Sequence, residues 1–253
     1  MTLLTVNHFS YAYGKKVALE DVNFTVEEGT VNVLLGNNGS GKSTVIKSVA
    51  RILRAKKGTI ALFDKDVVDY SPKEYARLVA YVPQTPEFDT MTVFDAVLLG
   101  RLPNFTSPKQ RDYDKVSESL RALGIENLSD ELVTDLSGGE RQKVALCRAL
   151  CSDAKLILLD EPTNNLDLKS KYGILETVKK ISKQGVSILT SMHDLNEALD
   201  LADEFILLND KRCVACGDRS VLTEELLGEV YDMDFEKVTH SEKIHFHIKE
   251  KRQ

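Results

Sequence analysis

A glycine-rich segment follows the apolar run Val31 to Leu35 directly, and it is the strongest constraint on how this chain folds. Its spacing is G-x-x-x-x-G-K-S, between a predicted buried strand and a helix predicted from Lys42 to Leu53. Glycines there let backbone N–H groups turn toward nucleotide phosphates, and a helix N-terminus adds positive potential. Lys42 can reach the β- and γ-phosphates, and the Ser43 hydroxyl can bind Mg²⁺. The predicted nucleotide contacts are Gly36, Asn37, Asn38, Gly39, Ser40, Gly41, Lys42, Ser43 and Thr44.

A second apolar run, Leu156 to Leu159, ends in the carboxylate of Asp160. Ligands of open α/β sheets bind at the carboxyl ends of strands, so Asp160 can hold the Mg²⁺ of a nucleotide directly or through water. Neighbouring residues of an extended chain point opposite ways, and Glu161 can therefore turn toward the γ-phosphate and polarise an attacking water. Such a general base contributes about 10²–10⁴ in rate. Locally, Glu161 also fits a structural role as a helix-entry carboxylate before Pro162.

Apolar strand-like runs alternate with amphipathic helical runs, which predicts an α/β fold. We expect a P-loop NTPase core, a mainly parallel sheet flanked by helices, in a single domain of residues 1–253. Alternating residues in Leu3–Phe9 and Asp21–Val26 predict an N-terminal antiparallel β subdomain. Residues 85–148 have helical periods and no convincing strand, which predicts an inserted α-helical subdomain. Its helices are expected at Thr92–Leu99, Pro108–Leu123 and Gly139–Cys151. The remaining core elements are expected as strands Val186–Thr190 and Glu204–Leu208 and helices Leu168–Lys183 and Asp194–Ala202.

Composition limits the function classes. The net charge is −6 with acids and bases interspersed, which argues against nucleic acid as a partner. No apolar run approaches the roughly 20 residues that span a bilayer, and the first residues lack a signal peptide's pattern; we expect a cytosolic location.

Cys147 and Cys151 lie four apart in a predicted helix, and Cys213 and Cys216 are half of a possible zinc site. No second pair stands at zinc-ribbon spacing, so buried thiols are favoured.

The segment Leu136-Ser137-Gly138-Gly139-Glu140-Arg141-Gln142 lies between the end of the first motif and Asp160. With it, the chain from Val6 to about Tyr231 closely resembles the ATP-binding cassette (ABC) family of transport ATPases. The resemblance implies ATP and Mg²⁺ as ligands and ATP hydrolysis as the activity. It implies catalytic roles for Glu161, His193, Gln84 and Lys42, Mg²⁺ contacts for Ser43, Gln84 and Asp160, adenine stacking for Tyr13, and a subunit-interface role for Asp167.

Two of these assignments have alternatives, and the role of the signature segment has a physical basis. Tyr11 is the second candidate for stacking on adenine, and His193 could simply cap the helix that follows it. Ser137, Gly138 and Gly139 begin a helix whose N–H groups and dipole form a second anion site. The resemblance implies that this site binds the nucleotide of a second subunit. Two chains arranged head to tail would close two such sites symmetrically.

Within the family, Gly100-Arg101-Leu102-Pro103 resembles the ATPases of iron-siderophore, haem and cobalamin importers. Asn209 to Cys213, in place of a glycine-containing turn, departs from that group, as does Ser191-Met192. The resemblance implies a second, identical ATPase subunit, a membrane permease, an extracytoplasmic solute-binding protein and a place at the cytoplasmic face of the membrane. The permease contacts expected beside Gln84 are Phe88, Met91, Val93 and Phe94. The alternatives are an exporter ATPase, a soluble ABC ATPase outside transport, and a nucleotide switch, which Glu161 and His193 disfavour.

Overall fold

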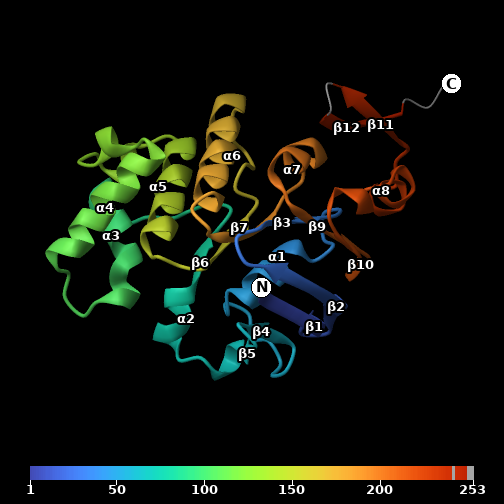
Figure 1. The fold of residues 1–253 in the computed structure, drawn as a ribbon, viewed down its shortest axis with the longest axis horizontal. Helices are drawn as coiled ribbons and strands as arrows, with labels where there is room; N and C mark the ends of the chain where they lie inside the picture. The colour runs from blue at the N-terminus through green and yellow to red at the C-terminus, as the bar shows by residue number, and fades with distance from the viewer. Residues whose placement is uncertain (241–242, 250–253) are drawn as a thin grey trace. The chain divides into compact units, whose positions relative to one another are not determined.

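The computed structural model describes residues 1–240 and 243–249, and the chain divides into two compact units. The first unit joins Met1–Val68 to the chain that begins at Leu189, and the second is Asp69–Ile188. Figure 1 labels most helices and strands of both units. The inserted subdomain expected over residues 85–148 falls inside the second unit, and its bounds stay a prediction.

The first unit opens with an antiparallel sheet, which confirms the prediction from the alternating N-terminal segments. The sheet consists of β1 (Thr2–Tyr13), β2 (Lys16–Glu27), β4 (Ile60–Leu62) and β5 (Lys65–Asp66), in the order β2-β1-β4-β5. Leu4 pairs with Val26 and Val6 with Phe24, and all four side chains are buried. Alternate residues of a strand share a face, so this register places the apolar set of each strand in the core.

Three further strands of the first unit position its nucleotide loop: β3 (Val31–Leu35), β9 (Glu204–Asn209) and β10 (Arg212–Gly217). β3 runs parallel to β9, which pairs antiparallel with β10. Every residue of β3 is buried, as is typical of parallel strands covered on both faces. Strand β8 (Ser187–Ser191) crosses from the second unit into the first. After it, the Met192 N–H donates to the Leu34 carbonyl at 3.1 Å, which brings the end of β8 to β3.

The helices of the first unit include one that is shorter than predicted. They are α1 (Lys42–Val49), α7 (Leu195–Leu201), the single turn η5 (Arg219–Val221) and α8 (Glu224–Tyr231), followed by the hairpin β11 (Phe235–His240) and β12 (Lys243–Ile248). α1 ends at Val49 and not at Leu53, because Arg51 takes the left-handed conformation with φ of 59°. The N–H groups of Ile52 and Leu53 then bond to the Lys47 carbonyl and close the helix end.

The second unit contains the parallel pair β6 (Val79–Val82) and β7 (Leu156–Asp160). β7 has the predicted bounds and is buried throughout. β6 was not predicted, because its four residues include two that are only half-buried and leave no clear period. It pairs Val79 with Leu156 and Val82 with Leu159, and so carries the following segment to the carboxyl end of β7.

Helices make up most of the second unit, and Figure 1 shows three of them, α3 to α5, as a cluster. The elements are α2 (Pro72–Leu78), α3 (Val93–Leu98), η2 (Leu99–Asn104), α4 (Gln110–Leu123), η3 (Glu126–Leu128), η4 (Val133–Asp135), α5 (Gly138–Cys151) and α6 (Leu168–Ser182); the turn η1 (Val67–Asp69) spans the boundary between the units. α5 contacts α3, α4 and α6. The predicted helices over 92–99, 108–123, 139–151 and 168–183 are confirmed to within a few residues.

A buried ion pair joins three of these elements. The Arg101 guanidinium of η2 lies 3.2 Å from Asp112 of α4, donates to the Cys151 carbonyl at 3.0 Å and also pairs with Asp153. Asp112 is fully buried, and its charge is therefore balanced inside the helical cluster.

The four cysteines divide into two kinds. Cys147 and Cys151 are buried in α5, and burial raises the pKa of the Cys151 thiol to about 11. They pack as small apolar groups, as predicted. Cys213 is half-buried and Cys216 is exposed on β10, so the expectation of a buried thiol is wrong for Cys216.

Candidate nucleotide-binding site

The loop between β3 and α1 requires glycine at its two ends. Gly36 has φ of 141° and Gly41 has φ of 107°, in the region that favours glycine. A Cβ on Gly36 would lie 2.2 Å from the Leu208 carbonyl oxygen, and one on Gly41 would lie 2.3 Å from Leu19 Cδ2. Substitution at either position therefore meets both backbone strain and a clash.

The polar groups of the loop fit an anionic ligand. The Lys42 ammonium is buried and donates to the carbonyl oxygens of Gly36 (2.7 Å) and Asn37 (3.2 Å), which hold it against the loop. α1 begins at Lys42 with no side-chain cap and no acidic residue in its first turn, so the helix dipole stays uncompensated there. The buried Ser40 hydroxyl has no hydrogen-bond partner within the described part of the chain. A phosphate supplies what this loop lacks, which is an acceptor of hydrogen bonds and a negative charge.

A side chain and a backbone carbonyl at the end of α8 hold the first residues of the loop in place. The Gly36 N–H donates to the Tyr231 hydroxyl at 3.2 Å, and the Asn37 amide donates to the Val230 carbonyl at 2.7 Å. Burial raises the pKa of Tyr231 to about 12, so the hydroxyl stays neutral. Sequence reasoning missed this contact, because no local pattern links residues so far apart in the chain.

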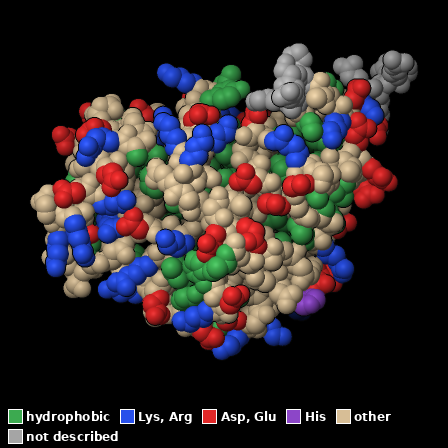
Figure 2. Space-filling model, in the orientation of Figure 1, with side chains coloured by type: hydrophobic (Ala, Val, Ile, Leu, Met, Phe, Trp, Pro, Cys, Tyr) green, Lys and Arg blue, Asp and Glu red, His purple; other side chains and the backbone are tan. Residues whose placement is uncertain are grey.

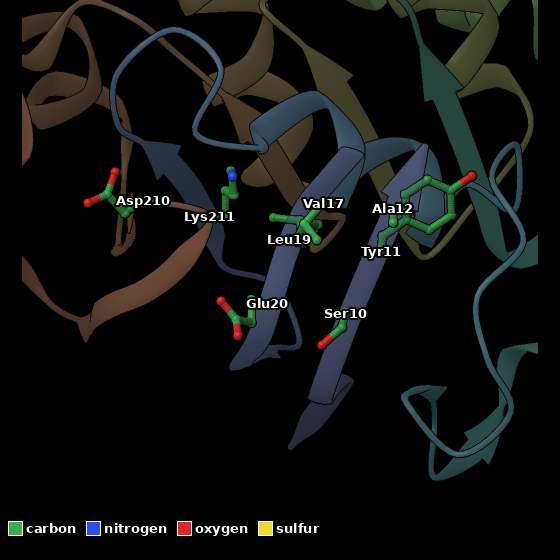
Figure 3. Close-up of a pocket in the computed structure, with 8 residues that line it drawn as sticks. All are labelled: Ser10, Tyr11, Ala12, Val17, Leu19, Glu20, Asp210 and Lys211. Atoms are coloured by element: carbon green, nitrogen blue, oxygen red, sulfur yellow. The ribbon is translucent and has the colours of Figure 1, made fainter. Parts of the chain in front are cut away.

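Two tyrosines of β1 lie beside this loop. Tyr13 is half-exposed, and its hydroxyl lies 3.4 Å from the Thr44 hydroxyl of α1. Its ring meets that of Tyr11 edge to face, with 5.1 Å between centroids. Tyr11 lines a pocket of about 500 Å³ with Leu19, the residue that touches Gly41. Figure 3 shows the Tyr11 ring pointing away from the Asp210 and Lys211 end of this pocket. Tyr13 thus stands next to the start of α1, and Tyr11 packs against Tyr13.

The predicted switch histidine follows β8 in the same unit. His193 is exposed and comes directly after Met192, whose N–H bonds to β3. The residue that caps α7 is the next one, Asp194, which accepts hydrogen bonds from the N–H groups of Asn196 (2.8 Å) and Glu197 (3.0 Å). His193 is therefore not needed to cap α7.

In the second unit, the predicted base and the predicted Mg²⁺ ligand differ in backbone conformation. Asp160 is buried at the end of β7. Burial of Tyr81 raises its pKa to about 12, and the negative charge of Asp160 adds to that shift. Glu161 takes a left-handed conformation with φ of 49°, a strain of about 1–3 kcal/mol for a residue other than glycine. This turn moves Glu161 off the line of the strand.

Two amides hold the Glu161 carboxylate. Gln84, just after β6, donates from Nε2 to Glu161 Oε2 at 3.0 Å, and Asn164 donates to the same oxygen at 2.9 Å. The structure therefore brings two predicted catalytic residues together. Asn164 is a contact that sequence reasoning did not single out. The sequence feature that could have identified Asn164 is its position three residues after Glu161. This is the spacing of a tight turn, and the Asn164 N–H does donate to the Glu161 carbonyl.

The helix that follows the signature segment is capped by its own side chains. Ser137 accepts a hydrogen bond from the Glu140 N–H at 3.3 Å, and Glu140 accepts from the Ser137 N–H at 2.9 Å and hydroxyl at 2.6 Å. These bonds hold the pKa of Glu140 below its usual range. The N-terminus of α5 already carries a carboxylate of its own chain, which an incoming anion would meet.

The start of α6 lies against the start of α5. Asp167 caps α6, with its two oxygens bonded to the N–H and hydroxyl of Ser170, both at 2.9 Å. A Cβ added to Gly139 would lie 2.5 Å from Ser170 Oγ, whereas one on Gly138 would have nothing closer than 3.8 Å. The structure thus places the predicted signature and interface residues next to each other.

The permease contacts predicted beside Gln84 are only partly accessible. A pocket of about 240 Å³ is lined by Pro86, Phe88, Thr134 and Arg141 among others. Val93 is fully buried on α3 and is therefore a core residue, which corrects its assignment as a contact.

Together, a glycine-rich loop that begins a helix and a buried strand that ends at Asp160 and is followed by Glu161 define the class of P-loop nucleotide-binding proteins. The chain belongs to the ABC transporter family, whose model matches residues 19–164. It is an ATP-binding ATPase of that family. None of the helices in the described ranges is long and apolar enough to cross a membrane.

Relatives and solved structures match nearly the whole chain. An uncharacterised ABC transporter ATP-binding protein of Methanocaldococcus jannaschii is 41% identical and aligns over 92% of this chain and 93% of its own. The iron(3+)-hydroxamate import ATP-binding protein of Bacillus subtilis is 35% identical over 94% of this chain and 91% of its own. The structure of a metal-chelate type ABC transporter in an inward-facing conformation superposes with a TM-score of 0.83 at 29% identity, covering 98% of this chain and 97% of that chain.

Proposed function

We propose that this chain is the ATPase of an importer for an iron chelate, haem or cobalamin, and that it works with Mg²⁺. The observation that carries the catalytic part is the Glu161 carboxylate held by Gln84 and Asn164 beside the acidic end of β7. The names of relatives support the cargo class: one imports iron(3+)-hydroxamate, and another is an achromobactin transport protein.

Lys42 and the loop around it bind the ATP phosphates in this proposal. The ammonium group stays near Gly36 and Asn37 and adds its charge to the dipole of α1. Ser43, Asp160 and Gln84 offer hydroxyl, carboxylate and amide oxygens, the donor set that Mg²⁺ prefers. The bound metal would neutralise charge that develops on the phosphates.

Glu161 is the general base in this proposal, and Gln84 positions it. The carboxylate oxygen that accepts both amides is oriented by them. Glu161→Gln should leave ATP binding intact and lower ATP turnover by about 10²–10⁴. The measurement is steady-state phosphate release beside equilibrium binding of ATP. Turnover at the wild-type rate would remove Glu161 from this role.

A second, identical subunit completes each site. Ser137 and Gly139 contact the γ-phosphate held by the partner, with Asp167 at the same interface, and His193 contacts the γ-phosphate of its own site. Since Glu140 bonds to Ser137 in this structure, the phosphate must compete with that carboxylate. Ser137→Arg should therefore block ATP turnover and leave ATP affinity of the monomer unchanged. If the ATP affinity of the monomer also fell in Ser137→Arg, the signature segment would act on the nucleotide bound by its own chain.

The partners proposed are a membrane permease and, through it, an extracytoplasmic solute-binding protein, with the ATPase at the cytoplasmic face of the membrane. The pocket beside the Gln84 segment, lined by Phe88 and Arg141, would receive a permease helix. The test is purification of Glu161→Gln with ATP from solubilised native membranes, followed by mass spectrometry. A stoichiometric many-spanning permease is expected. ATP-bound dimers that carry only soluble partners would overturn the transport assignment.

A further inference from the structure

A pocket in the second unit is lined by four cations, and no acidic side chain lies in its wall. It has a volume of about 400 Å³ and lies between α2 and the segment that joins η2 to α4. Its charged side chains are Lys73, Arg77, Lys109 and Arg111, and Thr106 and Ser107 add hydroxyl groups. On the face in Figure 2, Lys and Arg side chains gather over the ends of α3 and α4 that lie nearest α2.

Three of the four cations in this pocket lack a close ion pair among the residues that the structure describes. Lys73, Lys109 and Arg111 form no ion pair with a carboxylate anywhere in residues 1–240 and 243–249, and all three are exposed. Two carboxylates adjoin these cations in sequence, and both are engaged by other groups: Asp112 pairs with Arg101 at 3.2 Å and accepts the Lys109 N–H at 3.0 Å, and Glu74 accepts the Ser71 N–H at 2.8 Å. Like charges that line one pocket repel one another, so an anion bound there would relieve the repulsion.

Part of the pocket is already organised. Arg77 donates from Nε to the Pro103 carbonyl at 2.8 Å, which fixes its guanidinium against η2 and directs the terminal nitrogens elsewhere. The hydroxyl groups of Thr106 and Ser107 come just before α4. A fixed guanidinium, ammonium groups and hydroxyl donors together match the several oxygens of a phosphate.

We propose that this pocket binds a phosphate group. A concave site with guanidinium and hydroxyl donors favours this compact tetrahedral anion over an acidic protein segment, which a flat basic surface would serve equally well. A phospholipid headgroup and a free phosphate share the chemistry. Leu99 and Leu102, on η2 before the pocket segment, are 40% and 55% exposed and could meet the acyl region of a lipid.

The first experiment separates the pocket from general surface charge. The full-length protein, with its nucleotide loop filled by ADP and Mg²⁺, is floated with phosphatidylcholine vesicles that contain or lack phosphatidylglycerol. One variant is Lys73→Gln with Arg111→Gln, and the matched control is Lys180→Gln with Lys183→Gln, two exposed lysines at the end of α6. Each basic residue at an anionic membrane contributes about fivefold in affinity, so the pocket variant should bind about 25-fold more weakly. The control variant should change little.

A second arm identifies the source of the anion. Inorganic phosphate and a poly-glutamate peptide are titrated into the same proteins by calorimetry. Phosphate binding that the pocket variant loses, without vesicle binding, supports the proposal with a soluble ligand. Equal losses in the pocket and control variants overturn it, as does binding of poly-glutamate alone, which would indicate an acidic protein partner. Circular dichroism of the variants confirms that the exposed substitutions leave the fold intact.

Discussion

Adjacent glycines at the start of α5 differ in what an added methyl group would meet. Gly138 and Gly139 are neighbours in the same helical turn, and neither has a left-handed φ. A Cβ on Gly138 would lie 3.8 Å from Leu166 Cδ2, which is ordinary contact. A Cβ on Gly139 would lie 2.5 Å from Ser170 Oγ and 2.7 Å from Ser170 Cβ. The Cβ cannot rotate away, so α6 must move.

The difference in free energy of unfolding between Gly138→Ala and Gly139→Ala measures how closely Gly139 packs on Ser170. Alanine gains about 0.5–1 kcal/mol over glycine in a helix, and this gain cancels between the two variants. Overpacking costs about 1–3 kcal/mol, and only Gly139→Ala carries that cost. Gly138→Ala should therefore be as stable as the wild type or slightly more so. Gly139→Ala should be less stable than Gly138→Ala by about 1–3 kcal/mol.

Urea unfolding followed by far-ultraviolet circular dichroism gives the two free energies of unfolding. A double-mutant cycle then assigns the cause, because Ser170→Gly removes both clashing atoms. Ser170→Gly should recover most of the stability lost in Gly139→Ala, after its own cost is subtracted. Equal stabilities of the two alanine variants, or additive effects in the cycle, would refute the close packing of α5 on α6.

Two further predictions concern groups that sequence reasoning did not place. Tyr231→Phe leaves the N–H of buried Gly36 without its partner and should cost about 1–3 kcal/mol in thermal or urea unfolding; Tyr172→Phe, at a tyrosine that is 62% exposed, should change little. Glu140 has a lowered pKa in the folded protein, so its bonds to Ser137 stabilise the fold above the ordinary pKa of 4.5 and are lost as pH falls through the lower folded value. The stability gap between the wild type and Glu140→Gln should therefore be present at neutral pH and close in acid; a gap that persists there would contradict the role of the charge.

Elements with uninterrupted local signals could be predicted closely. β3 and β7 have their predicted bounds, because a continuous apolar run ends at a glycine in one and at an acidic pair in the other. β6 was missed because its half-buried residues show no period, and α1 was predicted too long because nothing in the sequence marks the left-handed Arg51. β6 forms because it pairs with β7, and α1 ends because of one backbone rotation at Arg51. Neither cause leaves a local pattern in the sequence.

The candidate site divides in the same way. Lys42 and Glu161 lie in motifs whose spacing carries the chemistry, so the sequence alone selects them. The hydrogen bonds around them depend on residues brought near by folding, such as Tyr231 at Gly36. The carboxylate on Ser137 does have a local signal, because Ser137 and Glu140 stand at the spacing of a capping box, but sequence reasoning did not use it.

The contact between the loop and α8 has a consequence for biosynthesis. Gly36 and Tyr231 are 195 residues apart, and β3 also pairs with β9, which is made late. At about 5–20 residues per second, a ribosome needs roughly 10–40 s after Gly36 to supply the partner of its N–H. The hydrogen bond that holds the Gly36 N–H therefore forms only after α8 has been synthesised.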